Sequence, residues 1–225
     1  MKVMETSLPG VLILESKVFS DARGLFLEVY NQRVFANLGI TEAFVQDNQS
    51  VSKKGVLRGL HYQVQSAQGK LVRVLQGEIF DAVVDLRLES PTFGKWAAER
   101  LSAANRKMIW IPKGFAHGFY TLSKTAEVLY KVTDFWTPQF EKTLLWNDPE
   151  IAIPWPLEGD PILSEKDRAA SEVPKIAQEL LRWTHQMTLI QRAMAVQQLS
   201  IIQKADRYRA AGGANSLGGG VQLRG

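Results

Sequence analysis

Three histidines occur in this chain of 225 residues, and two of them lie in similar surroundings. His61 belongs to residues 55–63 and His117 to residues 111–120, and both segments combine strand-like apolar residues with glycines. Histidine is the side chain best suited to move a proton near neutral pH, and glycine lets a backbone or ligand approach closely. The pattern indicates a proton-transfer site, although a pair of hydrogen-bonded core histidines would produce the same pattern.

A cation and a base share the first of these segments. Arg58 lies three positions before His61, so strict strand alternation would send the two side chains to opposite faces. A β-bulge at Gly59 would bring both side chains to one face. We therefore expect an irregular strand here, with Arg58 and His61 lining the same site.

Tyr130 is a second candidate for proton transfer. In the strand-like residues 126–132 it shares a face with Val128 and Val132, so its phenol should be partly buried. A buried phenol needs a hydrogen-bond partner and can donate a proton. A plain core aromatic fits the same pattern, so the sequence leaves both interpretations open.

The pattern around His61 argues against a catalytic metal, because Tyr62 and Gln63 follow it with no second histidine nearby. The chain has no glycine-rich phosphate loop, serine nucleophile elbow or dinucleotide fingerprint, so we expect no cofactor. Any phosphate must be held by side chains such as Arg23, Arg58 and Lys70, an arrangement that suits a diphosphate ligand.

Composition narrows the class of protein further. The chain has no cysteine and no apolar run of membrane-spanning length, and its first residues do not resemble a signal peptide. We therefore expect a cytoplasmic protein without a membrane span. The net charge is +4, but residues 175–225 hold seven basic and two acidic residues, a net of +5. The remaining body is balanced, which argues against nucleic acid as a partner.

Residues 11–155 are predicted to form many short strands without long intervening helices, which favours an all-β sandwich or barrel. A short helix is expected over residues 32–38. The strand-like segments are residues 26–30, 70–75, 79–86, 108–111 and 126–132.

The pattern changes after residue 174. Apolar residues recur at alternating spacings of four and three, which predicts a helix over residues 175–211, followed by a glycine-rich tail over 212–225. The apolar residues form a seam along this predicted helix. The seam could pack on the chain's own barrel, associate with a second copy, or be drawn to a membrane surface by the +5 charge. The seam consists of Ile176, Leu180, Trp183, Met187, Ile190 and Met194.

Eight blocks of sequence together resemble the dTDP-4-dehydrorhamnose 3,5-epimerase family, and they fall in consecutive order between residues 3 and 170. They are residues 21–24 (DARG), 46–48 (QDN), 56–63 (VLRGLHYQ), 69–74 (GKLVRV), 90–94 (SPTFG), 111–119 (IPKGFAHGF), 130–131 (YK) and 146–149 (WNDP). The resemblance implies a cupin-type jelly roll over residues 1–174, a homodimer, no metal and no cofactor. It also implies that the substrate is a nucleotide-sugar, dTDP-4-dehydro-6-deoxyglucose.

The resemblance also implies a role for each matching residue. His61 would be the base, Tyr130 the acid on the opposite face of the sugar, Asp167 the partner that orients His61, and Lys70 the cation that stabilises an enolate oxygen. The positions implied to contact the nucleotide-sugar are Arg23, Glu28, Gln46, Asn48, Arg58, His117, Glu141, Lys166 and Trp136.

Two features depart from the family. Trp136 stands where the family commonly has tyrosine, and the segment after residue 174 has no counterpart in the family. The sequence leaves three activities open: inversion at both C3 and C5, a single-carbon epimerase or ketoisomerase of the same fold, and a non-catalytic nucleotide-sugar-binding jelly roll.

Overall fold

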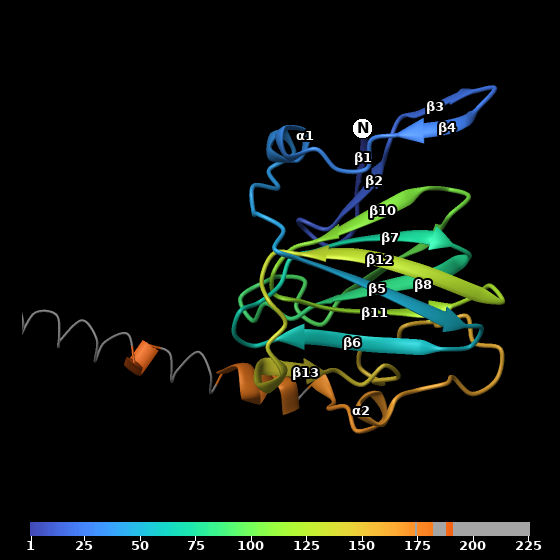
Figure 1. Cartoon of the computed structure of the whole chain (residues 1–225). Coiled ribbons are helices and arrows are strands. Elements are labelled where there is room, and N and C mark those ends of the chain that lie inside the picture. Colours follow the sequence, from blue (N-terminus) through green and yellow to red (C-terminus); the bar gives the residue numbers. More distant parts are fainter. Residues whose placement is uncertain (174, 182–187, 191–225) are drawn as a thin grey trace, which may run out of the picture. The chain divides into compact units, whose positions relative to one another are not determined.

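A computed structural model describes residues 1–173, 175–181 and 188–190 of the chain (Figure 1). The chain divides into two compact units, residues 1–180 and 181–225. Residues 175–181 and 188–190 are helical. None of the helices in these described ranges combines the length and the apolar character that a membrane span requires.

Two antiparallel sheets form the first unit. The six-stranded sheet has the spatial order β1 (Lys2–Glu5), β2 (Leu12–Glu15), β10 (Lys107–Ile111), β7 (Lys70–Gln76), β12 (Thr125–Val132) and β5 (Gln46–Lys53). The five-stranded sheet has the order β13 (Glu141–Thr143), β6 (Leu57–Gln63), β11 (Phe115–Thr121), β8 (Glu78–Asp85) and β9 (Trp96–Ser102). Strands distant in sequence are neighbours in both sheets, which is the crossing pattern of a jelly roll.

The remaining elements are short. A separate hairpin pairs β3 (Val18–Asp21) with β4 (Gly24–Leu27) and projects from the barrel in Figure 1. Helix α1 (Gln32–Asn37) begins at Asn31, whose side chain accepts hydrogen bonds from the backbone N–H groups of Arg33 and Val34. The other elements are the 3-10 helix η1 (Pro138–Phe140) and helix α2 (Glu165–Arg168).

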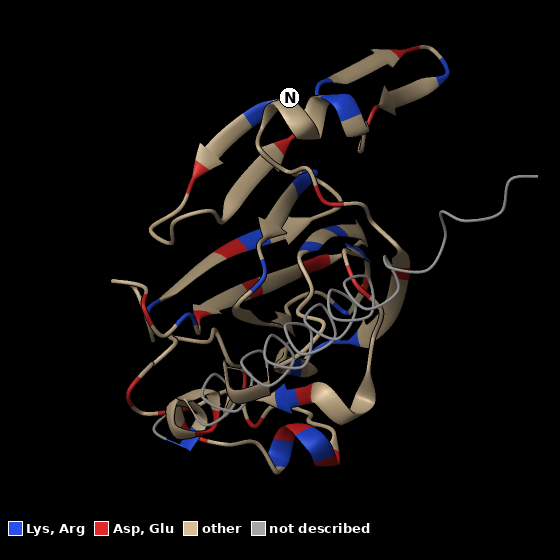
Figure 2. Cartoon of the chain, turned by 90° about the vertical axis from the view of Figure 1, so that its left-hand side faces the viewer, with Lys and Arg blue, Asp and Glu red and all other residues tan. Residues whose placement is uncertain are grey.

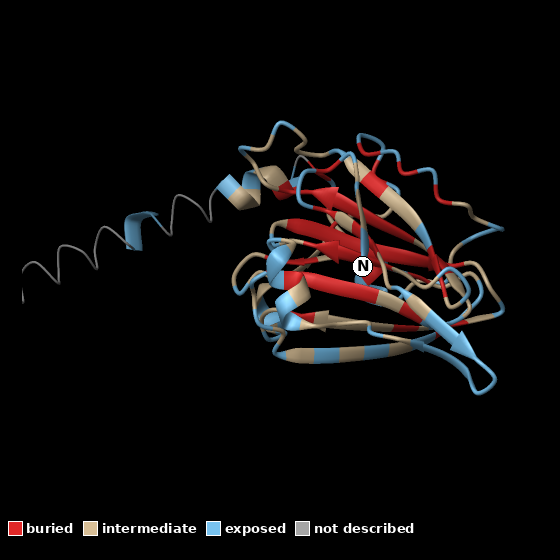
Figure 3. Ribbon diagram, turned by 90° about the horizontal axis from the view of Figure 1, so that it is seen from above, coloured by how far each residue is buried: buried red, intermediate tan, exposed pale blue. Residues whose placement is uncertain are grey.

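The main core lies between the two sheets. Alternate residues of each strand point inward, and the inward side chains of the two sheets form one buried cluster that includes Val72 and Val74 of β7, Ile79 and Val83 of β8, and Phe119 of β11. Figure 3 shows the buried residues concentrated in the strands at the centre of the sandwich. This packing fixes the strands whose ends and faces carry the site.

Both sheets are also covered on their outer faces. Phe35 of α1 and Ile40 pack over Leu14, Leu71 and other residues of the six-stranded sheet. The chain after β13 packs over the outer face of the five-stranded sheet, where it forms a second buried cluster, here called the outer cluster. It contributes Leu144, Ile151, Ile153, Trp155, Val173 and Ile176. Basic and acidic residues are interspersed along the strands and in α2 (Figure 2), in keeping with the balanced charge of the body.

The fold confirms the all-β class and the short helix near residue 32. The predicted strand over residues 26–30 is wrong in its extent, because β4 ends at Leu27 and Asn31 already caps α1. In the predicted seam, Ile176 is fully buried in the outer cluster and Leu180 packs against that cluster. Ile190, in contrast, is 45% exposed. Trp183, Met187, Met194 and the glycine-rich tail lie outside the described residues, so the predicted division after residue 174 and the helix over 175–211 stay predictions.

Candidate active site

The site is built on β6 and β11, whose pairing is irregular where two glycines meet. His117 of β11 pairs with His61 of β6, and Phe119 pairs with Arg58, so β6 carries one residue more than β11 between these pairs. Gly59 has a φ of +118°, and a Cβ on it would lie 2.5 Å from the Cα of Gly118. The predicted bulge at Gly59 is confirmed, and Arg58 and His61 line one pocket.

His61 is hydrogen-bonded to the carboxylate of Asp167, a residue of α2 that lies far from it in the sequence. Its Nε2 atom lies 2.6 Å from Oδ1 of Asp167, which is buried in α2. Ser164, the N-cap of α2, donates its hydroxyl to Oδ2 of Asp167 at 2.7 Å. Burial lowers the pKa of His61 below its usual value, and the hydrogen bond to Asp167 opposes that effect. The imidazole is therefore neutral at neutral pH, as a general base requires.

Lys70 supplies a buried cation at the start of β7. Its Nζ atom donates to the backbone carbonyl of His61 at 3.1 Å. Burial lowers the pKa of Lys70 to about 8, while the charges of Glu141 and Asp81 act in the opposite direction. The ammonium is thus the dominant form at neutral pH and can be aimed at a developing negative charge.

Tyr130 of β12 faces the same pocket, which has a volume of about 350 Å³. The side chain packs against the main core, and burial raises the pKa of its phenol, so the hydroxyl keeps its proton and can act as an acid. The residues that line this pocket are Gln46, Asn48, Ser50, Arg58, His61, Gln68, Lys70, His117, Gly118, Phe119, Tyr130, Trp136, Glu141 and Lys166.

One wall of the pocket is polar and already hydrogen-bonded. Gln46 donates its side-chain amide to Asn48 at 2.8 Å and accepts the backbone N–H of Trp136 at 3.1 Å. Lys166 of α2 forms an ion pair of 2.8 Å with Glu141 of β13.

Trp136 presents a half-exposed ring beside this ion pair. Burial opposes ionisation of Glu141, but hydrogen bonds from Lys166 and the Trp136 side chain outweigh it and lower its pKa. Arg58 is oriented by a hydrogen bond of 3.0 Å from its Nε to the hydroxyl of Ser52. Cations and an exposed aromatic ring thus lie together, as recognition of a phosphate-bearing aromatic ligand requires.

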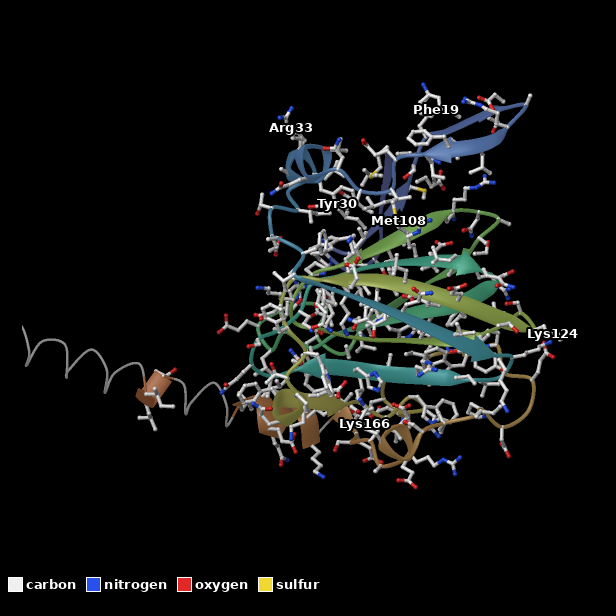
Figure 4. The ribbon with its side chains drawn as sticks, viewed as in Figure 1. Phe19, Tyr30, Arg33, Met108, Lys124 and Lys166 are labelled. Atoms are coloured by element: carbon white, nitrogen blue, oxygen red, sulfur yellow. The ribbon has the colours of Figure 1, made fainter. Side chains whose placement is uncertain are left out.

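Two of the predicted site residues lie elsewhere. Arg23 is at the tip of the β3–β4 hairpin, where it pairs with Asp21 at 2.6 Å with 90% of its side chain exposed. Glu28 follows the hairpin and accepts a hydrogen bond from Asn31. In Figure 4, Phe19 of this hairpin and Lys166 of the pocket lie at opposite ends of the barrel. Within one copy of the chain, Arg23 and Glu28 are therefore not brought to the pocket.

The sequence analysis missed three residues in or next to the site. Ser50 continues the inward alternation of Gln46 and Asn48 along β5, so strand periodicity could have found it. Gln68 lies in the loop before β7 and has no such pattern. Asp81, which hydrogen-bonds to His117 of the pocket, could have been noticed only as an acid inside the apolar run of β8.

The arrangement places a neutral imidazole, a buried ammonium and a protonated phenol around one small pocket. Such a set can remove a proton from carbon, stabilise the resulting oxyanion and return a proton. Within residues 1–173, 175–181 and 188–190, no group of three or more His, Cys, Asp or Glu residues is arranged to hold a metal ion.

Comparison with known proteins places this site in a family. The family model described as dTDP-4-dehydrorhamnose 3,5-epimerase matches residues 5–175. A curated dTDP-4-dehydrorhamnose 3,5-epimerase from Pseudomonas aeruginosa is 59% identical over 169 residues, which cover 75% of this chain and 93% of the relative. This chain belongs to the dTDP-4-dehydrorhamnose 3,5-epimerase family.

Solved structures agree with this family membership. The dTDP-6-deoxy-D-glucose-3,5-epimerase of Legionella pneumophila Philadelphia 1, in complex with dTDP-4-keto-L-rhamnose, matches with a TM-score of 0.78 and 50% identity, over 80% of this chain and 96% of that one. A 3'-monoepimerase from Streptomyces bikiniensis, in complex with dTDP-quinovose, is 28% identical with a TM-score of 0.72, over 84% of this chain and 98% of that one. The cupin-type jelly roll is thus shared by the 3,5-epimerase family and this more distant enzyme.

Proposed function

We propose that the chain inverts C3 and C5 of dTDP-4-dehydro-6-deoxyglucose and so produces dTDP-4-dehydrorhamnose. The observation that carries the proposal is the pocket that His61, Lys70 and Tyr130 line together, with His61 hydrogen-bonded to the buried Asp167. Membership of the 3,5-epimerase family supports the substrate and the number of carbons inverted.

The chemistry follows from the C4 ketone, which acidifies the hydrogens on C3 and C5. His61 removes one of these protons as the C–H bond breaks, and the electron pair moves to the C4 oxygen as an enolate. The Lys70 ammonium stabilises that oxygen. Tyr130 then delivers its phenolic proton to the opposite face of the carbon, which inverts it.

Each inversion leaves His61 with an extra proton and Tyr130 without one. Both must exchange protons with water before the second carbon reacts, so solvent hydrogen should enter the sugar at each inverted carbon. This proton balance makes isotope exchange a direct record of which carbons are processed.

The nucleotide half of the substrate fits the polar wall of the pocket. We assign contacts with the diphosphate to Arg58, supported by Ser52, and contacts with the sugar and nucleoside to Gln46, Asn48, His117, Glu141 and Lys166. The half-exposed Trp136 ring is suited to stack on the nucleotide base.

We propose that the working form is a homodimer in which the β3–β4 hairpin of one copy reaches the pocket of the other. The hairpin exposes Phe19, Leu25 and Phe26, an apolar surface that is costly to leave in water. It also carries Arg23, with Glu28 just beyond it, which the family resemblance assigns to substrate binding. Mixing Arg23→Ala and His61→Ala proteins should restore activity in mixed dimers if the hairpin acts on its neighbour.

We infer a cytoplasmic location, because the chain contains no cysteine and so forms no disulfides that would call for an oxidising compartment.

The decisive test is incubation with dTDP-4-dehydro-6-deoxyglucose, followed by proton NMR of the product. The couplings of H3 and H5 report the configuration of each carbon, and we expect both to be inverted. Inversion at one carbon alone would identify a single-carbon epimerase, and tight binding without conversion would identify a binding protein.

A further inference from the structure

One buried carboxamide bonds to the chain on both sides of Trp136. Gln63, the last residue of β6, is 8% exposed and lies two positions after His61. Its Oε1 atom accepts the backbone N–H of Thr137 at 2.7 Å, and its Nε2 atom donates to the backbone carbonyl of Phe135 at 3.2 Å. The side chain thus holds the two residues that flank Trp136 in the sequence.

The segment that carries Trp136 has little apolar packing of its own. Phe135 is 61% exposed and Trp136 is 54% exposed, so burial of these two rings does not fix the backbone that carries them. Residues 133–137 belong to no helix or strand. Ordering a backbone costs conformational entropy, so other contacts must hold this segment in place.

Three glutamines supply such contacts to four consecutive residues, 134–137. Gln68 donates to the backbone carbonyl of Asp134 at 2.9 Å, and Gln46 accepts the N–H of Trp136 at 3.1 Å. The hydrogen bonds to residues 135 and 137 come from Gln63. Gln46 and Gln68 also line the pocket, whereas Gln63 does not. Replacing Gln63 therefore removes support from Trp136 without removing a group that faces the substrate.

The ring of Trp136 is oriented from the same part of the sheet. Its side chain donates a hydrogen bond to Glu141, the residue of β13 that pairs with Gln63 of β6. Gln63 also donates to the backbone carbonyl of Ser66 at 2.7 Å, in the loop that follows β6. An aromatic ring binds a ligand more tightly when it is already held in the bound position, so this support should contribute to affinity.

We propose that Gln63 is a positioning residue for nucleotide recognition: it holds the backbone on both sides of Trp136 and so presents the ring to the nucleotide base. The inference rests on the proposed function, in which Trp136 stacks on that base. Gln63 acts through Trp136 and not on the reacting atoms, so it should affect substrate affinity and leave the chemical steps unchanged.

The role can be tested with Gln63→Met, which keeps the length of the side chain and removes its hydrogen-bonding groups. We expect the Kd for dTDP, measured by calorimetry, and the KM for the nucleotide-sugar to rise by roughly ten-fold, within the range that one stacked base contributes. Since His61, Lys70 and Tyr130 are untouched, kcat should stay within about two-fold of the wild type.

A double-mutant cycle tests whether the effect passes through the ring. Trp136→Ala alone should raise the Kd for dTDP by a similar factor. Adding Gln63→Met to Trp136→Ala should then change the Kd little, because the group that Gln63 positions is already gone. A general loosening of the barrel would instead weaken dTDP binding equally with and without the ring.

A matched control lies in the turn between β9 and β10. The carboxamide of Asn105 also makes three hydrogen bonds to backbone groups: it donates to Arg100 at 2.7 Å and accepts from Ser102 and Lys107, each at 3.0 Å. Asn105 does not line the pocket. Asn105→Ala should lower the melting temperature and leave both the Kd for dTDP and the KM unchanged.

A second variant guards against misfolding of the first. Gln63→Asn keeps a carboxamide but is one methylene shorter, so it cannot reach both residues that flank Trp136, and the Kd for dTDP should again rise. The proposal is overturned if a folded Gln63 variant keeps the wild-type Kd, if kcat falls while KM is unchanged, if the effect persists in the Trp136→Ala background, or if neither variant folds, which would make the role structural. A wild-type protein that binds dTDP without converting the nucleotide-sugar would instead contradict the proposed function.

Discussion

The Nε2 atom of His61 lies 2.6 Å from Oδ1 of Asp167, a residue 106 positions further along the chain. Because Asp167 is an acceptor, this hydrogen bond places the imidazole proton on Nε2 and leaves Nδ1 as the basic nitrogen. The pair therefore fixes both the orientation and the tautomer of the proposed base.

Replacing the base should stop the reaction. His61→Ala should lower proton exchange by about a hundred- to ten-thousand-fold, the usual contribution of a general base, while the protein still folds and binds dTDP. Exchange is measured by NMR in heavy water. Tyr62→Phe is the matched control, because Tyr62 is next in β6 and its buried hydroxyl has no hydrogen-bond partner among the residues that the structure describes. A His61→Ala protein with more than about a tenth of wild-type activity would exclude His61 as the base.

Neutralising Asp167 should change both the rate and its pH dependence. The carboxylate raises the pKa of His61 against the effect of burial, so Asp167→Asn should lower that pKa further. The acid limb of kcat/KM should then move to lower pH, while the maximal rate falls by roughly a hundred-fold because the tautomer is no longer fixed. A pH–rate profile measured on both proteins checks this. An acid limb that stays in place would show that His61 does not set it.

Removing the phenol should separate exchange from inversion. Tyr130→Phe leaves His61 able to abstract a proton, so deuterium should still enter the sugar at a reduced rate, while net inversion is strongly impaired. Tyr120→Phe serves as control, since the Tyr120 hydroxyl accepts the backbone N–H of Glu158, and its loss should cost about 1 kcal/mol of stability. Equal loss of exchange and inversion in Tyr130→Phe would assign Tyr130 to substrate positioning instead.

Dialysis against a chelator should leave activity unchanged, because the described part of the chain holds no group of three or more His, Cys, Asp or Glu residues arranged to bind a metal ion. Activity assayed before and after dialysis checks this. Loss of activity that a divalent ion restores would overturn the proton-transfer mechanism.

The segment after the barrel should be dispensable for chemistry. Removing residues 181–225 should leave kcat unchanged, because all proposed catalytic groups lie in the first unit. Ending the chain at residue 174 also removes the fully buried Ile176, which should cost about 2–5 kcal/mol of stability. Measuring kcat and thermal melting of both truncated proteins tests the unchanged kcat of the first and the lower stability of the second. A protein ending at Leu180 that folds and binds dTDP without turnover would contradict the first.

Local sequence signals predicted much of the barrel. Alternation in residues 126–132 placed Tyr130 on the face of Val128 and Val132, and the glycine at 59 predicted the bulge that unites Arg58 with His61. These features depend on neighbours along one strand, so periodicity and backbone sterics are sufficient to find them.

Local sequence signals could not show which distant residues come into contact in the site. Asp167 reaches His61 because the chain after β13 packs back over the five-stranded sheet, a long-range arrangement that only the family resemblance anticipated. Arg23 matches a family position but lies on the projecting hairpin, because sequence similarity does not say which copy of a chain a residue serves. Asp81 was not found, since its hydrogen bond with His117 joins two different strands.

The central claim is that both carbons flanking the ketone exchange their protons with inversion, and deuterium labelling tests it most directly. The enzyme is incubated with dTDP-4-dehydro-6-deoxyglucose in heavy water, and deuterium at C3 and C5 is counted by NMR and mass spectrometry. The account predicts one deuterium at each carbon in the inverted product, with labelling by His61→Ala slowed by about a hundred-fold or more. Label confined to one carbon, or absent from both in an enzyme that binds the nucleotide-sugar, would contradict it.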